Sequence, residues 1–290
     1  GERAERELRA ALAAVEVGGG PRLVATRAVA GNRLADHLLR HGLLDDAEPL
    51  FAAALAELTP ADDPALGRPE ELQVRGYSTW GLGRVAFLRE RYVESVPLLQ
   101  QAAELYEAAV SAYPSDPSLQ VSLASVLTEF AQVRRQLGAP SAELDAMLSR
   151  ARSLFKRVAG GPAVDSRGRE SRRVCLDVLC GLRAGEDDGA RLADAARELA
   201  EIAGEDARRS AMAAWHLLHA AAMLDGEGDA AAARSCDDSA LAALEACDTA
   251  GWFPPVNLDD PPCRRLDGRA AFESLRQRHP PSQAAKPGRR

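Results

Sequence analysis

Apolar residues recur every three to four positions along most of this chain, which is the spacing of residues on one face of an α-helix. The clearest case is the stretch GNRLADHLLRHGLLDDAEPLFAAALAELTP, residues 31–60. It contains two short apolar faces, one on each side of a glycine that ends the first helix. The residues that define this pattern are Leu34, Ala35, Leu38, Gly42, Ala47, Phe51 and Ala54. The stretch therefore predicts two helices closed into a hairpin.

The same spacing predicts helices over nearly the whole chain, separated by clusters of glycine and proline. A first helix is expected over 2–17, and a second begins at residue 21 and continues into the opening hairpin. Further pairs, and a short last helix, are expected over 70–113, 118–161, 166–203, 211–251 and 268–277. Pro49 and Pro97 take the same place in the opening turns of two second helices, where a missing N–H is tolerated. This shared feature indicates that the pairs are internal repeats.

We expect an all-α fold, a right-handed α-solenoid of antiparallel helix pairs with a short C-terminal capping helix. Alanine and leucine dominate and aromatic residues make up only 4%, so a β-sheet would have few strand-forming residues. A leading helix and a glycine break are expected over 1–20, and helical repeats over 21–250. A turn and the capping helix follow over 251–278, and a disordered basic tail over 279–290.

The charge pattern narrows the choice of partner. The formal charge is -7 and the isoelectric point is near 5.4. Arginines alternate with Asp and Glu, which is typical of solvated helix faces, whereas nucleic-acid binding needs clustered Lys and Arg. No run of about 20 apolar residues could span a bilayer, and the N-terminus lacks a signal-peptide core. We therefore expect a cytoplasmic segment that binds no nucleic acid and does not itself insert into a membrane.

The first residues already lie inside a helical pattern and do not begin with methionine. We therefore expect the chain to be part of a longer protein, whose upstream region would supply any catalytic domain or membrane tether. The cysteines form no CxxC pair, and an odd number of them in a chain of this length does not suggest a disulfide framework. They are Cys175, Cys180, Cys236, Cys247 and Cys263. We expect a reducing compartment, with Cys175 and Cys180 acting as small core residues.

Several patterns resemble sites of chemistry but fit a structural role better. His37 and His41 are four residues apart on one predicted helix face, but HLLRH lacks the glutamate of a zinc-binding HExxH helix and has no third ligand. His216 and His219 are three residues apart, beside Trp215 in an apolar helix. The glycines at 18–20 lack the GK[ST] ending of a phosphate-binding loop. We expect no metal, no cofactor and no catalytic residue.

Pairs of aspartates recur along the chain, at 45–46, 187–188, 237–238 and 259–260. Helix capping and the helix dipole explain the first three pairs, because carboxylates accept hydrogen bonds from free N–H groups at helix starts. The last pair lies in VNLDDPP, which lacks the dense oxygen-ligand spacing of a calcium loop. No serine, histidine and aspartate are ordered as a catalytic triad.

The opening hairpin resembles the tetratricopeptide repeat (TPR), a two-helix unit of about 34 residues. The resemblance rests on a small residue in each helix, an aromatic residue in the second helix and a proline at the exit, here Pro60. It departs from the repeat at Gly31, where a tryptophan is usual. TPR proteins are stacked helical scaffolds that bind other proteins, so the resemblance implies that class and does not identify the ligand.

Over residues 2–278 the chain resembles the C-terminal helical-repeat region of large bacterial serine/threonine protein kinases. The segments that carry this resemblance are LADHLLRHGLLDDAEPLFAAAL, ELYEAAVSAYPSDPSLQVSLASVL and the series from AARELAEIA to GWFPPVNLDDPPCRRLDGRAAFESL. A helix pair followed by an acidic, proline-containing turn and a short helix is similar to the end of that family's array. None of the kinase motifs themselves, a glycine-rich loop, strand lysine, HRD or DFG, occurs in this chain.

The concave wall of stacked repeats is formed by the first helix of each pair, and its outward residues recur at i, i+3 or i+4. These positions give a predicted peptide-binding set: Asn32, Asp36, Arg40, Tyr77, Trp80 and Arg84. Amide, guanidinium and aromatic groups together suit an extended peptide. The alternative is that Tyr77 and Trp80 only pack against the neighbouring hairpin.

Three classes of function follow from these patterns. The first is a non-catalytic scaffold for a protein or peptide, serving as the sensor or docking arm of a kinase or as a stand-alone adaptor. The second is an architectural spacer, which a bland concave wall would indicate. The third is a helical enzyme with a site built from scattered His and Asp, which a pocket uniting such groups would indicate.

Overall fold

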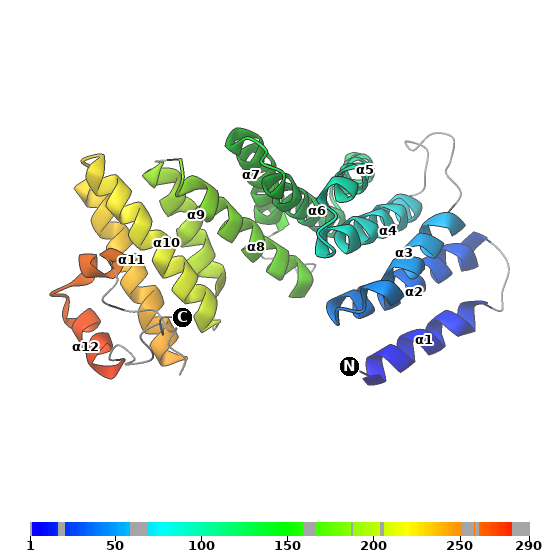
Figure 1. Ribbon diagram of the computed structural model, residues 1–290, viewed down its shortest axis with the longest axis horizontal. Helices are drawn as coiled ribbons and strands as arrows, with labels where there is room; N and C mark the ends of the chain where they lie inside the picture. The colour runs from blue at the N-terminus through cyan, green and yellow to red at the C-terminus, as the bar shows by residue number, and fades with distance from the viewer. Residues whose placement is uncertain are drawn as a thin grey trace, which may run out of the picture. The chain divides into compact units, whose positions relative to one another are not determined.

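The computed structural model describes eight parts of the chain: 2–16, 21–58, 69–158, 166–186, 188–203, 206–250, 258 and 261–279. Within these parts it contains twelve α-helices, one 3-10 helix and no strand (Figure 1). The predicted all-α architecture of consecutive helix pairs is confirmed. Several predicted features lie outside the described residues: the glycine break at 18–20, the loop after Pro60, the turn at 251–257, the aspartates at 187, 259 and 260, and the tail at 280–290.

The chain divides into two compact units, Gly1–Arg172 and Arg173–Arg290. The helices of the first unit are α1 (Glu2–Glu16), α2 (Pro21–Arg40), α3 (Leu44–Glu57), α4 (Pro69–Leu88), α5 (Tyr92–Ala112), α6 (Pro117–Gln136), α7 (Ser141–Val158) and the start of α8 (Ser166–Arg183). Helices α2 and α3, α4 and α5, and α6 and α7 pack as pairs. The first helices also pack on one another, α2 on α4 and α4 on α6. This contact gives the unit a continuous wall of first helices.

The opening hairpin has the faces that its sequence predicts. The apolar residues of α2 and α3 named above are all buried, and most of them form one core cluster with Val85 of α4. Helix α2 ends at Arg40, and the turn after it contains Gly42, whose φ of 75° lies in the left-handed region that glycine adopts at little cost. The N–H groups of Gly42 and Leu43 bond back to the carbonyls of Leu39 and Leu38, both at 3.0 Å. These bonds close the helix end.

A repeat of 48 residues runs through the three hairpins of the first unit. Gly42, Glu90 and Gly138 are spaced by this interval, and all three have a positive φ in the turn between paired helices. The interval is longer than the roughly 34 residues of a standard TPR unit. Long first helices account for part of this length, since α2, α4 and α6 each have 20 residues. Long first helices lengthen the wall that they form together.

Glu90 adopts a left-handed backbone conformation, with a φ of 59°. This conformation destabilises the folded state, because the Cβ of Glu90 crowds the backbone. We expect Glu90→Gly to raise the free energy of unfolding by about 1 kcal/mol, since glycine removes this crowding. Gly42→Ala is the matched opposite change, because no atom lies within 4 Å of the added methyl. It should lower stability by a similar amount. Urea denaturation followed by circular dichroism measures both, and a loss of stability in Glu90→Gly would contradict the expectation.

The second unit contains the rest of α8, α9 (Gly189–Ala203), α10 (Ala207–Gly226), α11 (Ala230–Thr249), the 3-10 helix η2 (Pro261–Leu266) and α12 (Ala270–Arg278). Its main core is built from alanine, leucine and cysteine, with Phe272 and Leu275 of α12 packed into it. All five cysteines are buried and none forms a disulfide, and the burial of Cys175 and Cys180 agrees with the core positions predicted for them. Helix α12 therefore covers the end of the apolar core, which is the place predicted for a capping helix.

The aspartates at 237 and 238 do not cap a helix, which corrects the sequence interpretation. Both lie in the middle of α11, and Asp237 is only 4% exposed. Arg265 of η2 donates to the two carboxylate oxygens of Asp237 at 3.1 and 3.3 Å. Arg269, just before α12, donates to Asp238. The acidic pair therefore fixes the C-terminal elements to α11, a role that depends on contacts between elements distant in sequence.

The buried thiol of Cys247 on α11 should make the free energy of unfolding depend on pH in the alkaline range. Its thiol donates to the carbonyl of Ala207 at 3.0 Å, and burial raises its pKa from 9.0 to about 11. The folded state therefore holds the proton more tightly than the unfolded state. This contribution is complete below pH 9 and is lost as the pH rises through 11, at a cost of roughly 2 kcal/mol. We expect Cys247→Ala, compared with the unchanged chain by urea denaturation between pH 8 and 11, to lose stability less steeply. Parallel curves would contradict this.

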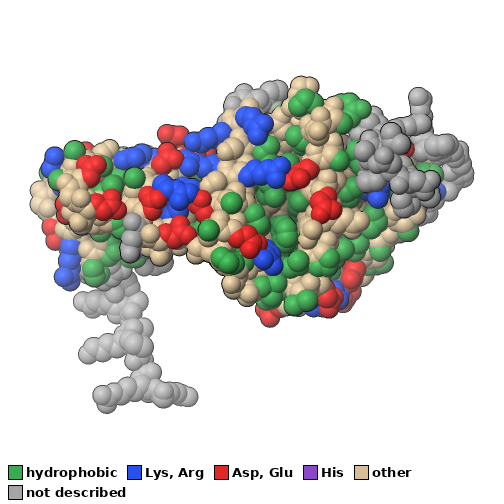
Figure 2. Space-filling view, turned by 90° about the horizontal axis from the view of Figure 1, so that it is seen from above, with side chains coloured by type: hydrophobic (Ala, Val, Ile, Leu, Met, Phe, Trp, Pro, Cys, Tyr) green, Lys and Arg blue, Asp and Glu red, His purple; other side chains and the backbone are tan. Residues whose placement is uncertain are grey.

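The surface carries interspersed charges. Figure 2 shows Lys and Arg side chains scattered among Asp and Glu on the face that it presents. Many of them form ion pairs between neighbouring helices, such as Arg134 with Glu143 at 2.8 Å and Arg150 with Glu107 at 2.6 Å. The Arg134 guanidinium holds the pKa of the Glu143 carboxyl below its usual range. No helix within the described ranges is both long and apolar enough to cross a bilayer.

Candidate functional site

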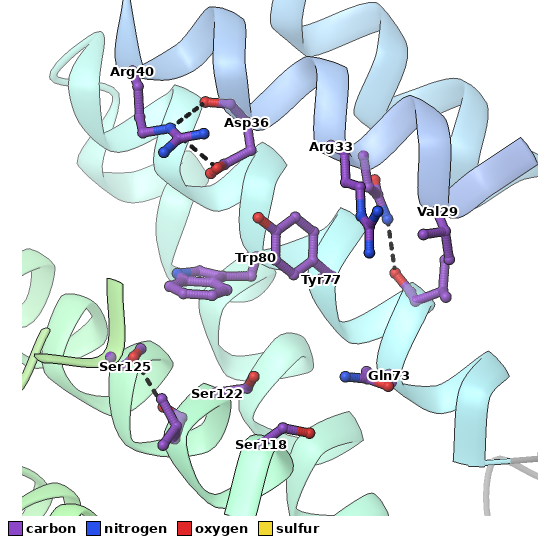
Figure 3. Close-up of a pocket in the computed structure, with 14 residues that line it drawn as sticks. Val29, Arg33, Asp36, Arg40, Gln73, Tyr77, Trp80, Ser118, Ser122 and Ser125 are labelled. Carbon is purple, nitrogen blue, oxygen red and sulfur yellow. Dashed lines mark hydrogen bonds and ion pairs between the residues drawn. The ribbon is translucent and has the colours of Figure 1, made fainter. Parts of the chain in front are cut away.

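A groove of about 520 Å³ runs along the first helices of the three hairpins, α2, α4 and α6 (Figure 3). We call it the first-helix groove. Its lining residues come from these helices and the start of α8: Val29, Asn32, Arg33, Asp36, Arg40, Gln73, Val74, Tyr77, Trp80, Ser118, Val121, Ser122, Ser125 and Gly168. All of them belong to the first unit.

The groove is lined by equivalent positions of successive repeats. Val29, Tyr77 and Ser125 are 48 residues apart, and each lies on the first helix of its pair. Since one repeat follows the next with the same interval, the same face of α2, α4 and α6 is turned to the groove. The groove is therefore a product of the repeat and its register.

Of the six residues that the sequence predicts for peptide binding, the groove is lined by Asn32, Asp36, Arg40, Tyr77 and Trp80. Arg84 is not among its lining residues. It lies beside them, where its Nη1 is 3.2 Å from Oδ1 of Asp36. The structure thus brings the six residues together at one wall of the first unit.

Asn32 holds two helices together. The side chain is buried, and its Nδ2 donates to the carbonyl of Val74 at 3.4 Å. The buried hydroxyl of Ser78 donates to Oδ1 of Asn32 at 3.0 Å. Because its amide is engaged on both sides, Asn32 joins α2 to α4 and offers little to a ligand. Its part in the groove is to shape the wall.

A chain of charged and aromatic groups connects the three first helices. Arg84 lies between Asp36 on α2, at 3.2 Å, and Glu129 on α6, at 3.0 Å. Its guanidinium is 5.4 Å from the ring centre of Trp80, whose Nε1 donates to Glu129 at 2.7 Å. Asp36 has a second partner in Arg40, at 3.3 Å. The network offsets each charge with an opposite one and sets the spacing of α2, α4 and α6.

The remaining side chains face the open space of the groove. Arg33 is exposed, and Figure 3 shows its guanidinium directed into the space between α2 and α6. Tyr77, Gln73 and Ser122 are half-buried and line the same space from α4 and α6. Apolar surface comes from three valines on the three helices, Val29, Val74 and Val121. The groove can therefore hydrogen-bond a chain and also hold an apolar side chain.

The groove is poorly equipped for catalysis. Among the described residues that line it there is no histidine and no cysteine, and its one carboxylate is Asp36. That carboxylate is already bound by Arg40 and Arg84. A general base must be free to accept a proton, and a nucleophile needs such a base beside it. The arrangement favours binding over reaction.

The histidine pairs lie outside the groove. His37 is buried and its ring centre is 4.6 Å from that of His41. It takes the place that Val85 and Val133 take in the next two repeats, both of them buried core residues. This equivalence explains His37 as a core position. Within the described residues, no group of three or more histidines, cysteines, aspartates or glutamates is arranged to hold a metal ion.

In the second histidine pair, His216 joins two helices of the second unit, whereas His219 contacts its own helix. Nε2 of His216 is 3.2 Å from Oδ1 of Asp177 on α8. Nδ1 of His219 is 3.1 Å from the carbonyl of Trp215, one turn earlier, and its ring lies 5.2 Å from the indole. These contacts agree with the sequence interpretation of the pair as packing residues.

The sequence analysis did not predict the residues of α6 that line the groove. Ser118, Ser122 and Ser125 of α6 were not predicted, because the apolar pattern of the third hairpin is blurred. Arg33 and Gln73 were also missed, since they lie one position from the chosen helix stripe or one turn before it. The interval between Gly42 and Gly138 could have aligned the third hairpin, and that alignment places Ser125 at the position of Tyr77.

The sequence matches no protein-family model and no curated protein. Among solved structures, BtubC (BKLC) from P. vanneervenii is 18% identical, with a TM-score of 0.50 over 88% of this chain and 94% of that chain. A putative kinesin light chain from Podosopora anserina with TPR-like repeats is 16% identical, with a TM-score of 0.46 over 78% and 98%. YrrB, described as a TPR protein with an unusual peptide-binding site, is 17% identical, with a TM-score of 0.37 over 77% and 91%. At such identities the similarity to BtubC shows the fold alone, which is an all-α array of helix pairs.

Proposed function

We propose that this chain is a non-catalytic TPR-like scaffold whose first-helix groove binds an extended segment of a protein partner. One observation carries the proposal: three consecutive first helices turn equivalent positions to a single groove of about 520 Å³. Pockets of roughly this size hold ligands in many proteins. A groove built by repeats is also long in the direction in which the repeats stack, which suits an extended chain.

The lining suits a peptide in particular. An extended peptide presents backbone N–H and C=O groups along its length, and side chains that alternate in direction. Gln73, Tyr77 and Ser122 offer donors and acceptors for the backbone, while the three valines offer apolar surface for a side chain. Trp80 and Arg84 belong to the supporting network, so we assign ligand contact mainly to Arg33 and Tyr77, together with Arg40, which is exposed although it also pairs with Asp36.

Blocking the groove tests this proposal. A phage-displayed library of random decapeptides is selected on the whole chain, and the affinity of the enriched peptides is measured by fluorescence anisotropy. We expect Ser122→Trp to weaken binding by at least roughly tenfold, about 1.4 kcal/mol, because an indole at this half-buried position would fill the groove.

The matched control is Ser153→Trp, which places the same ring on the exposed face of α7 outside the groove. It should leave the affinity unchanged. Circular dichroism spectra of both variants check that the helices are intact. A library that yields no enriched peptide, or equal affinities for the two variants, would reject the groove as the binding site.

We further propose that the scaffold is the sensor or docking arm of a bacterial serine/threonine kinase. The support is the resemblance of three segments, beginning at residues 34, 104 and 195, to the helical-repeat region of that family. Sequencing the gene upstream of this segment tests it. A kinase domain in the same reading frame is the expected result. Its absence would favour a stand-alone adaptor instead.

A further inference from the structure

The charges that line the first-helix groove are unequal in number. Arg33 and Arg40 of α2 line it, and Asp36 is the lining carboxylate. Arg84 and Glu129, which lie behind the lining, pair with each other at 3.0 Å. The groove and its supporting network therefore hold three cationic and two anionic side chains, although the whole chain has a formal charge of -7.

Asp36 is not available to a cationic ligand. Its carboxylate is bound from one side by Arg84, at 3.2 Å, and from the other by Arg40, at 3.3 Å. The residue is buried, so a ligand cation would have to displace one of these arginines to reach it. Removing a partner from a buried charge is costly. The one lining carboxylate thus does not attract basic ligands.

Asp116 is another carboxylate beside the groove, since it accepts a hydrogen bond from the hydroxyl of the lining residue Ser118 at 2.7 Å. It caps the N-terminus of α6, where its Oδ1 accepts from the N–H of Ser118 at 2.8 Å. The positive end of a helix dipole offsets a negative charge at this position. Asp116 is therefore already matched within the fold.

Donor groups remain on the open side of the groove. The guanidinium of Arg33 is directed into the space that Gln73 and Ser122 also line (Figure 3). A guanidinium presents several N–H groups in a planar fork that fits a carboxylate, and the amide and hydroxyl can each donate one more hydrogen bond. The three valines of the lining lie in the same groove. An acidic group and an apolar group could thus be held next to each other.

We infer that the first-helix groove selects an acidic segment of a protein partner, an extended peptide that places an Asp or Glu side chain on Arg33 and an adjacent apolar side chain on the valines. This inference rests on the proposed function, because it names the chemistry of the ligand that the groove would bind. The positive charge of Arg33 favours a carboxylate at this site. The overall negative charge of the protein would repel acidic partners elsewhere on its surface.

The test starts from the decapeptides enriched on the whole chain. Their sequences should share an Asp or Glu at one fixed position. Replacing that residue by Asn or Gln in a synthetic peptide should weaken binding roughly tenfold, as for one charge-assisted hydrogen bond at a partly exposed site. In the Arg33→Ala variant the same peptide replacement should have little effect, since the two changes remove one interaction.

Two further variants test whether positive charge in the groove strengthens binding of the acidic peptide. Arg135→Ala removes an exposed arginine of α6 outside the groove, and it should leave the affinity unchanged. Asp36→Asn, which releases Arg40 and Arg84 from a carboxylate, should tighten binding of the acidic peptide; urea denaturation of the same variant separates this effect from a loss of support in the wall. Affinity for that peptide should fall as salt is raised, because the pairing charges are partly exposed.

Several results would overturn the inference. The first is a set of enriched peptides that share no acidic position. The second is a peptide replacement that weakens binding to the Arg33→Ala variant as much as it weakens binding to the unchanged chain. The third is tighter binding when phosphoserine replaces the acidic residue, which would make phosphate the ligand. Binding that Ser122→Trp abolishes but Arg33→Ala leaves intact would reject the acidic preference and keep the groove. The absence of any peptide sensitive to Ser122→Trp would reject the proposed function itself.

Discussion

Replacing Gly81 with alanine is expected to lower the free energy of unfolding of the first unit by about 2 kcal/mol. Gly81 lies in α4, where an added Cβ would be only 2.4 Å from Cε1 of Phe51 on α3. The Phe51 ring is fully buried in the core of the opening hairpin, so it cannot move aside freely. Overpacking of this kind costs about 1–3 kcal/mol, which exceeds the gain of up to about 1 kcal/mol in helix propensity.

The control is Gly31→Ala on α2, where the nearest atoms to an added Cβ are 3.9 Å away. With no crowding, only the helix propensity changes, and stability should rise by about 0.5–1 kcal/mol. Phe51→Leu should make Gly81→Ala less harmful in the double variant, because a smaller side chain leaves room for the methyl group. Urea denaturation followed by circular dichroism measures all of these. A Gly81→Ala protein as stable as Gly31→Ala would contradict the close packing of α3 against α4.

Replacing Arg84 with methionine is expected to destabilise the first unit by about 3 kcal/mol. The change leaves Glu129 without its ion pair and removes one of the two partners of buried Asp36. It also removes the cation that lies over the Trp80 ring. Breaking a buried pair by deleting one partner typically costs about 3–5 kcal/mol, and the partial exposure of Arg84 and Glu129 places this one at the lower end.

Arg89→Met is the matched control, because Arg89 follows α4 and also pairs with two carboxylates, Asp45 and Glu48. Its partner Asp45 is 97% exposed, so this pair is screened by water and should be worth less than about 1 kcal/mol. Both variants are compared by urea denaturation at low and high salt. Equal losses for Arg84→Met and Arg89→Met would show that the network in the groove wall is no stronger than a surface ion pair.

The role of Arg84 changes how the groove has to be tested. Reversing its charge would weaken binding even if Arg84 never touched a ligand, because the wall of α2, α4 and α6 would lose a shared support. Arg33 is the better probe, since it is exposed and lines the groove. A loss of affinity in Arg33→Ala, with stability unchanged, reports on ligand contact alone.

The helix pairs could be predicted because their determinants are local. The apolar spacing of residues such as Leu34, Leu38 and Phe51 predicts which face of each helix is buried, whatever the neighbouring helix is. A glycine such as Gly42 ends a helix through its own backbone freedom. These signals act within one or two turns of helix, so the sequence alone determined the elements and much of the core.

The tertiary structure decided which polar residues face one another. Arg84 and Asp36 were predicted as ligand contacts, but they bind each other across two helices whose packing no local pattern specifies. The aspartate at 237 looked like a helix cap, but it holds Arg265 of η2. Such pairings depend on the distance and rotation between helices far apart in the sequence, which are set by the packing of the whole core. The sequence determined the repeating unit, whereas only the packed helices determined where the groove lies and which of its charges are already paired.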